Sequence, residues 1–271
     1  MKIFKNKKTL IKKLNGDQNL SFIPTMGALH KGHLSLIKKA KKKRFKTLVS
    51  VFINPKQFER KQDFKRYPKN LRKDIQILKK EKIDYLFIPK FKDIFSFKCQ
   101  NKVFLSNFSN KLCGKFRIGH FKGVLEVVNR FLEIIKPRYI FLGKKDYQQL
   151  YLIKKHIKKR KIKSKIIECK TIRENNGVAL STRNSNLYED QMKIASNIYY
   201  YLYNLKKKIK KNYNLFNPNR IKKDLRDLGA RKIDYLENYN IENFKKIKRQ
   251  NKKFNIFIAY YIKNIRLIDN I

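Results

Sequence analysis

The sequence predicts an α/β protein, in which a doubly wound parallel sheet is followed by a smaller α+β domain. Short, continuous apolar runs alternate with stretches of helical periodicity through about the first 175 residues. Such runs are typical of parallel strands that are buried on both faces. One long helical stretch, a shorter one and several strand-like runs follow. With 271 residues, 42% of them hydrophobic, the chain can bury a sizeable core.

The first part of the chain is expected to alternate helices and strands in a regular order. Its opening segment is expected to be an amphipathic helix, because Ile3, Leu10 and Leu14 recur at helical spacing without the apolar core of a signal peptide. The run KTLVSVFIN indicates a buried strand that ends in the turn NPKQF. The expected elements are a helix over 1–14, a strand over 20–25, a helix over 33–44, a strand over 46–54, a helix over 70–82, a strand over 83–89, a helix over 123–135, a strand over 138–143, a helix over 147–159 and a strand over 164–172.

The second part has a different character. Met192, Ile198, Leu202 and Ile209 lie on one face of a long predicted helix. A second helix is expected over 219–228, and strands are expected over 232–237, 254–262 and 265–269. We therefore expect two domains, 1–175 and 176–271.

The charge of the chain is extreme. Its formal net charge is +49, from 69 Lys and Arg against 20 Asp and Glu, and such a balance normally suggests a polyanionic partner. However, the lysines are scattered along the whole chain and accompany an excess of Ile, Asn, Tyr and Phe, which have A/T-rich codons. We therefore attribute the charge to compositional bias and expect no nucleic-acid function. A nucleic-acid-binding protein remains the alternative of another class.

The cysteines and the hydropathy indicate the compartment. Cys99, Cys113 and Cys169 show no paired spacing, so they predict neither a disulfide framework nor a zinc site. No run is long and apolar enough to span a bilayer, so no membrane association is expected. A reducing cytoplasm is the expected location.

The stretch PTMGALHKGH follows the first predicted strand and opens a helix. Gly27 lets a ligand approach the backbone, and Gly32 keeps the space between the two imidazoles clear. A helix start supplies N–H groups and a positive dipole end for an anion. His30 and His33 lie three residues apart, which places both imidazoles on one side of the first turn. Together these features indicate a phosphate site.

Three more polar stretches lie at predicted strand ends, where a doubly wound sheet binds its ligands. They are FINPKQF with Asn54 and Gln57, GKKDYQQL from Gly143, and ALSTRNS with Ser181, Thr182 and Arg183. Each stretch alone also fits a structural role: a capped helix start, a β-turn, a solvated turn or a helix cap. Their occurrence together, each at a strand end, favours a functional site.

These stretches, together with RYPKNL, GHFKGV and the terminal RLIDN, resemble the pantothenate synthetases, ligases that join pantoate to β-alanine. The motifs span nearly the whole chain in the family's order. The resemblance implies a Rossmann-like first domain and a C-terminal α+β lid. Another member of the HxGH nucleotidyltransferase superfamily would share the first motif, but NPKQF and GKKDYQQ are not expected there.

The resemblance further implies a reaction in two steps. ATP and pantoate would give pantoyl adenylate and pyrophosphate with Mg²⁺, and the amine of β-alanine would then displace AMP. The implied catalytic residues are His33, His30, Lys145 and Arg183, with His33 in the family's proton-donor role, and the implied pantoate and β-alanine residues are Gln57 and Gln149. The implied ATP-binding residues are Met26, Gly27, Ala28, Leu29, His30, Lys31, Gly32, His33, Gly143, Lys144, Lys145, Asp146, Ile172, Leu180, Ser181, Thr182 and Arg183.

The resemblance leaves some residues without a role and shows some departures. Metal ligands are not assigned, although Asp63 and Asp74 are candidate carboxylates. His120 is expected to be structural or peripheral, and His156, on a basic helix, is expected to be solvated. A homodimer through the N-terminal domain is implied. Thr182 replaces a usual serine, while Lys69 and Lys122 replace arginines, which keeps the hydroxyl or the charge.

Overall fold

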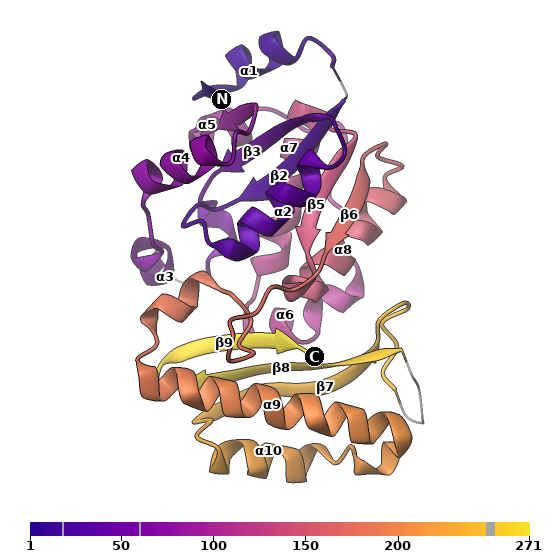
Figure 1. The fold of residues 1–271 in the computed structure, drawn as a ribbon. Coiled ribbons are helices and arrows are strands. Elements are labelled where there is room, and N and C mark those ends of the chain that lie inside the picture. Colours follow the sequence, from indigo (N-terminus) through magenta and orange to yellow (C-terminus); the bar gives the residue numbers. More distant parts are fainter. Residues whose placement is uncertain (18, 60, 248–252) are drawn as a thin grey trace. The chain divides into compact units, whose positions relative to one another are not determined.

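The computed structural model describes residues 1–17, 19–59, 61–247 and 253–271. Their contacts divide the chain into two compact units, Met1–Thr171 and Ile172–Ile271 (Figure 1). The expected boundary after residue 175 lies a few residues inside the second unit. The binding functions expected of the two domains remain predictions.

The first unit is built on a parallel sheet of six strands in the order β1-β4-β3-β2-β5-β6. The chain therefore winds in one direction from β2 to β4 and in the other from β2 to β5 and β6. The crevice between β2 and β5 is the topological switch point, where such sheets bind ligands. The strands are β1 (Lys2–Phe4), β2 (Leu20–Thr25), β3 (Lys46–Val51), β4 (Tyr85–Phe87), β5 (Tyr139–Gly143) and β6 (Lys165–Cys169).

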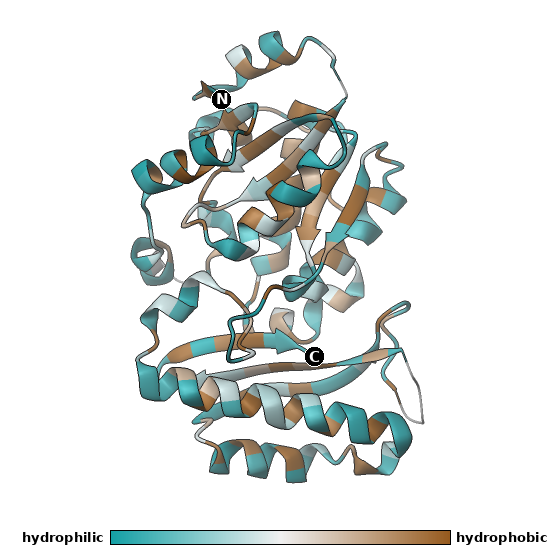
Figure 2. Ribbon diagram, viewed as in Figure 1, coloured by the Kyte–Doolittle hydropathy of each residue, from teal (hydrophilic) through white to brown (hydrophobic). Residues whose placement is uncertain are grey.

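Helices cover both faces of this sheet. Phe22 and Ile23 follow one another on β2 and therefore point to opposite faces. Ile23 packs in one cluster with Ile37 and Leu78, and the Phe22 ring lies 5.5 Å from that of Phe131. Hydrophobic residues accordingly form much of the central strands, beside a few polar ones (Figure 2). The helical segments of this unit are α1 (Lys7–Leu14), α2 (Lys31–Lys41), α3 (Lys61–Arg66), α4 (Leu71–Lys80), α5 (Phe91–Phe95), α6 (Cys113–Phe116), α7 (His120–Ile135) and α8 (Tyr147–Lys159), with short 3₁₀ turns η1 (Pro55–Gln57), η2 (Asn107–Asn110) and η3 (Lys144–Asp146).

The prediction of one helix over residues 1–14 is wrong for its first part. Residues Lys2–Phe4 form β1, whose Ile3 and Phe4 pair with Leu86 and Phe87 of β4. The helix begins only after Asn6, whose side-chain oxygen accepts a hydrogen bond from the Thr9 amide. Pairing with a distant strand thus overrides the local helical spacing.

The second unit is a separate α+β layer, as expected. Its antiparallel sheet has the order β7-β8-β9, formed by Lys232–Asn240, Phe254–Ile262 and Ile265–Asn270. Ile198 and Leu202 of the long helix pack in one core cluster with Ile256 and Ile258 of the central strand. The helical segments are α9 (Glu189–Lys211), α10 (Pro218–Asp227) and the 3₁₀ turns η4 (Thr182–Asn186) and η5 (Tyr213–Leu215).

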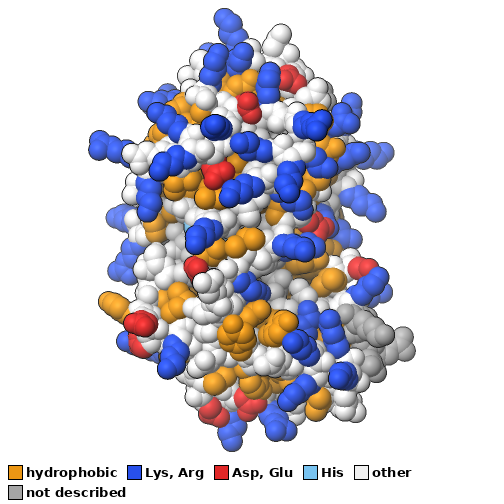
Figure 3. Space-filling model, viewed as in Figure 1, with side chains coloured by type: hydrophobic (Ala, Val, Ile, Leu, Met, Phe, Trp, Pro, Cys, Tyr) orange, Lys and Arg blue, Asp and Glu red, His pale blue; other side chains and the backbone are white. Residues whose placement is uncertain are grey.

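The structure shows where the basic side chains lie and in which state the cysteines are. Lys and Arg side chains are spread over the face in view rather than gathered on one element (Figure 3). Cys99, Cys113 and Cys169 are free thiols. Within the described ranges, none of the helices has the length and apolarity that crossing a membrane requires.

Candidate active site

Two of the motifs meet at the switch point of the first unit. PTMGALHKGH continues from β2, and Gly143–Asp146 ends β5 and forms η3 beside it. The charges of Lys145 and Asp146 act on both His30 and His33, the lysine lowering and the aspartate raising their pKa values. The structure therefore brings these two sequence-distant motifs together.

A buried carboxylate holds the turn between β2 and α2. Asp74 of α4 accepts hydrogen bonds from the Ala28 amide at 2.9 Å and from the Leu29 amide at 2.8 Å. Gly27 and Ala28 have φ values of 81° and 51°, in the left-handed region. A Cβ on Gly27 would lie 2.8 Å from an Asp74 oxygen, so a glycine is required there. Asp74, considered from the sequence only as a magnesium ligand, uses both oxygens to position the motif.

The two histidines fix each other. His30 caps α2, with its Nδ1 accepting from the Gly32 amide at 3.1 Å, and His33 Nδ1 accepts from the His30 amide at 3.3 Å. Their ring centroids are 4.1 Å apart, which confirms that they share one side of the first turn. Since each Nδ1 is an acceptor, each neutral ring carries its proton on Nε2.

This geometry limits the expectation that the helix start offers free amides to an anion, because three amides of this turn already have partners within the motif. The amides of His30 and Gly32 donate to the imidazoles, and that of His33 donates to the His30 carbonyl at 2.8 Å. Beside its backbone, the motif carries the two Nε2–H donors of His30 and His33.

Burial makes these imidazoles uncharged. Desolvation by burial, followed by the charge of the neighbouring His30, lowers the pKa of His33 to about 3. Desolvation and Lys145 also lower the pKa of His30. At neutral pH His33 is therefore a hydrogen-bond donor and not a cation.

The turn η1 brings Gln57 to the same place. Gln57 is buried, and its side-chain nitrogen contacts the Met26 sulfur of the first motif. Arg117 donates to His120 Nε2 at 3.0 Å, so His120 Nδ1 donates to the Gln57 carbonyl, 2.7 Å away. His120 therefore anchors the Gln57 turn, in keeping with the structural role expected of it.

Asn54, next to this turn, has a structural role, because its side chain is buried and hydrogen-bonded within the protein. It is buried, its oxygen accepts from the Lys56 amide, and its nitrogen donates to the Gly123 carbonyl at 3.0 Å. A Cβ on Gly123 would lie 2.2 Å from the Lys56 carbonyl oxygen, so this glycine lets α7 approach the turn.

The residues after β5 divide into two groups. Lys144 pairs with Glu168 of β6 at 3.0 Å, whereas Lys145 lies near Asp146 and the histidines. On α8, Gln148 is buried and bonds the Phe108 and Lys111 carbonyls, while Gln149 is half-buried. Gln148 is thus structural, which leaves Gln149 as the glutamine available to a ligand.

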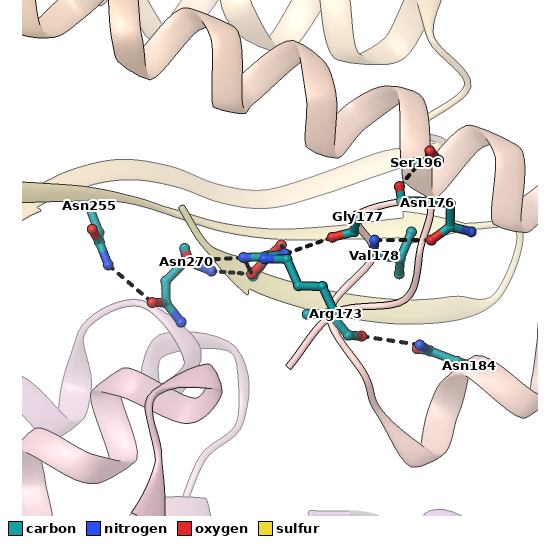
Figure 4. Close-up of polar contacts among 10 residues, drawn as sticks. Arg173, Asn176, Gly177, Val178, Asn184, Ser196, Asn255 and Asn270 are labelled. Carbon is teal, nitrogen blue, oxygen red and sulfur yellow. Dashed lines mark hydrogen bonds and ion pairs between the residues drawn. The ribbon is translucent and has the colours of Figure 1, made fainter. Parts of the chain in front are cut away.

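In the second unit, the residues predicted to bind ATP lie at the base of a hairpin and directly after it. The sequence pattern did not lead us to expect this hairpin. Arg173 and Ala179 form an antiparallel bridge, and the Leu180 amide donates to the Ile172 carbonyl at 3.0 Å. Ile172 and Leu180 are therefore brought together at the base of the hairpin. Figure 4 shows its strand residue Arg173 and its turn at Asn176 and Gly177. This Asn-Gly dipeptide was the signal that could have predicted the hairpin.

The remaining predicted residues follow the hairpin directly. Ser181 caps η4 by accepting from the Arg183 amide at 3.2 Å. The Arg183 guanidinium donates to the Arg266 carbonyl of β9 at 3.0 Å. Thr182 begins η4 and is half-buried.

The prediction that His156 is solvated is wrong. The residue is fully buried on the inner face of α8. Its Nδ1 accepts from the Phe104 amide at 3.1 Å, and its Nε2 lies 3.0 Å from the Asn129 side-chain oxygen. Burial lowers its pKa to about 4. The lysines around it in the sequence lie on the other faces of the helix.

A metal would have to be held largely by the substrate. Within the described ranges, no cluster of three or more His, Cys, Asp or Glu side chains could ligate an ion. Mg²⁺ is commonly bound through one or two carboxylates together with substrate phosphates and water. Asp146, exposed beside Lys145, fits such a single ligand, whereas Asp74 is engaged by amides and Asp63 is an exposed residue of α3.

Comparison with known proteins decides the family. A family model described as pantoate-beta-alanine ligase matches residues 2–271. This chain belongs to the pantoate–β-alanine ligase family. A pantothenate synthetase from Francisella tularensis subsp. mediasiatica is 40% identical over 257 residues, covering 93% of this chain and 89% of the relative. One from Sulfurihydrogenibium sp. is 37% identical over 259 residues, covering 94% and 92%.

Solved structures of pantoate–β-alanine ligases share the fold. The Francisella tularensis ligase complexed with β-γ ATP and β-alanine has a TM-score of 0.83 and 40% identity, with 100% of this chain and 97% of that chain covered. The pantothenate synthetase from Thermus thermophilus has a TM-score of 0.92 and 28% identity, with 100% and 99% covered. The predicted fold class and family resemblance are thereby confirmed.

Proposed function

We propose that this chain joins pantoate to β-alanine in two steps, through a pantoyl adenylate formed at the switch point of the first unit. Membership of the pantoate–β-alanine ligase family shows the ATP-dependent ligase activity. The observation that supports the site is that four side chains converge there. They are the Nε2–H donors His30 and His33, the cation Lys145 and the amide of Gln57.

In the first step, a carboxylate oxygen of pantoate attacks the α-phosphorus of ATP, and the bond to the leaving pyrophosphate breaks. Two anions must approach each other, so the site must offset charge and align them. Lys145 supplies positive charge, and His30 and His33 donate Nε2–H bonds to phosphoryl oxygens as negative charge develops. Burial lowers the pKa of His33 to about 3, so its ring enters the step as a neutral Nε2–H donor.

In the second step, the unprotonated amine of β-alanine attacks the acyl carbon, the acyl–oxygen bond breaks, and AMP leaves. The amine proton is then released. Gln57 and Gln149 are proposed to hold pantoate, and Gln57 also to face β-alanine. The intermediate must be shielded from water, because its hydrolysis would consume ATP without forming the amide.

Further ATP contacts are proposed from the resemblance for both units. Met26–His33 and Gly143–Asp146 are proposed as the ATP segments of the first unit, and Ile172 and Leu180–Arg183 as those of the second. Arg183 would bind the triphosphate, and the second unit would serve as the lid. Mg²⁺ would be held by the phosphates with Asp146 as the protein carboxylate, and it would supply charge neutralisation.

The setting of the enzyme is also proposed. The free thiols of Cys99, Cys113 and Cys169 accord with a reducing compartment, so we place the protein in the cytoplasm. A homodimer through the first domain is proposed from the resemblance, and neither a membrane nor a nucleic acid is part of the proposed function.

An isotope experiment tests the proposed intermediate. Pantoate labelled with ¹⁸O in its carboxylate should transfer one label to AMP, because the attacking oxygen stays on phosphorus when the amine displaces the nucleotide. Pyrophosphate release should require pantoate, and pantothenate should appear when β-alanine is added. Unlabelled AMP would contradict the adenylate, and pyrophosphate release independent of pantoate would contradict the ligase.

A variant tests whether His33 acts in the first step alone. His33→Ala should slow pyrophosphate release by roughly 100-fold or more, the usual cost of removing one transition-state donor. It should leave the attack of β-alanine on preformed pantoyl adenylate nearly unchanged. An equal loss of rate in both steps would contradict the proposed role of His33 as a donor in adenylate formation.

A further inference from the structure

The hairpin of the second unit is fixed at its tip by contacts with α9. The Asn176 carbonyl accepts from Ser196 Oγ at 2.7 Å, and the Asn176 side-chain oxygen accepts from the Val178 amide at 3.1 Å (Figure 4). Gly177 has a φ of 83°, and a Cβ there would lie 2.2 Å from the Tyr199 ring. Neither the φ nor the space would suit a side chain, so the tip has one tightly defined position.

An ion pair fixes the base of the hairpin. The Arg173 guanidinium contacts the two Asp269 oxygens of β9 at 2.7 and 3.0 Å, a bidentate arrangement, and donates to the Gly177 carbonyl at 3.0 Å. It also lies 4.3 Å from the centre of the Tyr199 ring. One side chain therefore joins both ends of the hairpin turn to β9 and to α9.

The network continues beyond this ion pair. The Arg173 guanidinium lies 3.5 Å from the Asn270 carbonyl, and the Asn270 side chain accepts from Asn255 at 3.1 Å. Asn255 itself accepts from Lys206 of α9 at 2.7 Å. The C-terminal end of β9 is thus tied to the central strand and to the long helix, which makes it a firm base for the hairpin.

The segment proposed to bind ATP leaves this hairpin without an intervening linker. Asn184 donates to the Ala179 carbonyl at 3.1 Å, which ties η4 back to the hairpin. Arg183 reaches β9 at Arg266, the same strand that carries Asp269. The place of the Arg183 guanidinium therefore depends on where the hairpin is held against β9.

We propose that Arg173 and Asp269 are positioning residues for nucleotide binding: their bidentate pair fixes the position of the hairpin against β9 and so holds Leu180–Arg183 in the conformation that binds the triphosphate. This inference rests on the proposed ATP role of Leu180–Arg183. Arginine is needed because its planar fork matches both carboxylate oxygens, whereas a lysine offers a point charge.

The Arg173→Lys variant tests this directly because it retains the charge but loses the fork. It should raise the KM for ATP in pantoate-dependent pyrophosphate release by roughly tenfold, since small misplacements of binding groups are costly. The rate of β-alanine attack on preformed pantoyl adenylate should stay near the wild-type value. Asp269→Asn should act in the same direction, and the double variant should be less harmful than the two single effects combined.

A second ion pair in the same unit provides the matched control. Arg266 and Asp234 pair at 2.7 Å, with side chains 11% and 1% exposed, against 20% and 11% for Arg173 and Asp269. The Asp234 pair links β9 to β7 and does not touch the hairpin, and Arg183 contacts only the main-chain carbonyl of Arg266, not its side chain. Asp234→Asn should lower the unfolding midpoint while leaving the KM for ATP unchanged.

The outcomes separate this inference from the proposed function. If folded Arg173→Lys or Asp269→Asn kept a wild-type KM for ATP, or if Asp234→Asn raised it equally, the positioning role would be overturned. Arg183→Ala, measured alongside, should raise the KM for ATP. If it did not, the ATP role of Leu180–Arg183 and the positioning role would both be lost, whereas pantoate-dependent pyrophosphate release would still stand for the ligase.

Discussion

At the scale of single residues, the side chain that holds the turn of the first motif in place is that of Asp74, not that of either histidine. Its two oxygens hold the Ala28 and Leu29 amides and thereby keep the turn in its left-handed conformation. Replacing one oxygen by an NH₂ group would set a donor against an amide donor. Asp74→Asn should therefore displace His30 and His33 and reduce pantoate-dependent pyrophosphate release by roughly tenfold or more.

Asp84 supplies the control for this prediction. Its carboxylate also accepts two hydrogen bonds, from the amide and hydroxyl of Thr47 at 2.8 and 2.9 Å, but at the amino end of β3. Asp84→Asn should reduce the free energy of unfolding without lowering turnover. If both variants lost stability alike and Asp74→Asn kept full activity, Asp74 would be only a structural residue.

At the scale of elements, the sequence predicted the regular parts of the fold well because their signals are local. The helix over 147–159 and the strand over 20–25 have the observed bounds, since each has the periodicity and the turn residues of its own class. The strand β1 was not predicted, because it depends on pairing with a distant strand. The hairpin from Arg173 to Ala179 was missed although its Asn-Gly turn is a local signal, and only its ion pair with Asp269 depends on a distant residue. The interlocked amides of the histidine motif and the burial of His156 likewise become visible only in three dimensions.

The buried His156 couples α7 and α8 to a loop, and this makes the first unit sensitive to acid. Asn129 of α7 bonds both His156 and the Asn101 carbonyl, while His156 receives the Phe104 amide. Burial is the largest cause of its pKa of about 4, the neighbouring Arg160 adds to the lowering, and Glu133 opposes it. Because the unfolded state takes up this proton near pH 6.5, the stabilisation is complete above that pH and is lost as the pH falls toward 4.

This coupling gives a measurable pH dependence. Between about pH 8 and pH 5, His156 should account for about 2 kcal/mol of lost unfolding free energy. His156→Gln should lower stability at pH 8 but remove that share of the pH dependence, as measured by urea unfolding at both pH values. His30 and His33 act in the same direction, so part of the dependence should remain. A variant with an undiminished loss between the two pH values would contradict the assignment.

At the scale of the whole molecule, the net charge of +49 must affect behaviour even where it has no role in catalysis. Unbalanced charge of one sign disfavours the compact state and attracts polyanions regardless of their sequence. Both effects act through solvent and are screened over about 10 Å at 0.1 M salt. The spread of Lys and Arg over the visible face, rather than one focused patch, fits such an unspecific field (Figure 3).

Salt should therefore separate incidental binding from function. Single-stranded RNA, followed by fluorescence anisotropy, should bind at about 50 mM salt and lose affinity by about 1,000-fold or more by 200 mM, because counterion release drives the association. Pantothenate formation at about 200 mM salt should be unaffected by added RNA, since the ligase site depends on directed donors rather than on the overall field. Tight, saturable RNA binding that persisted at about 200 mM salt would show that the positive charge has a nucleic-acid function after all.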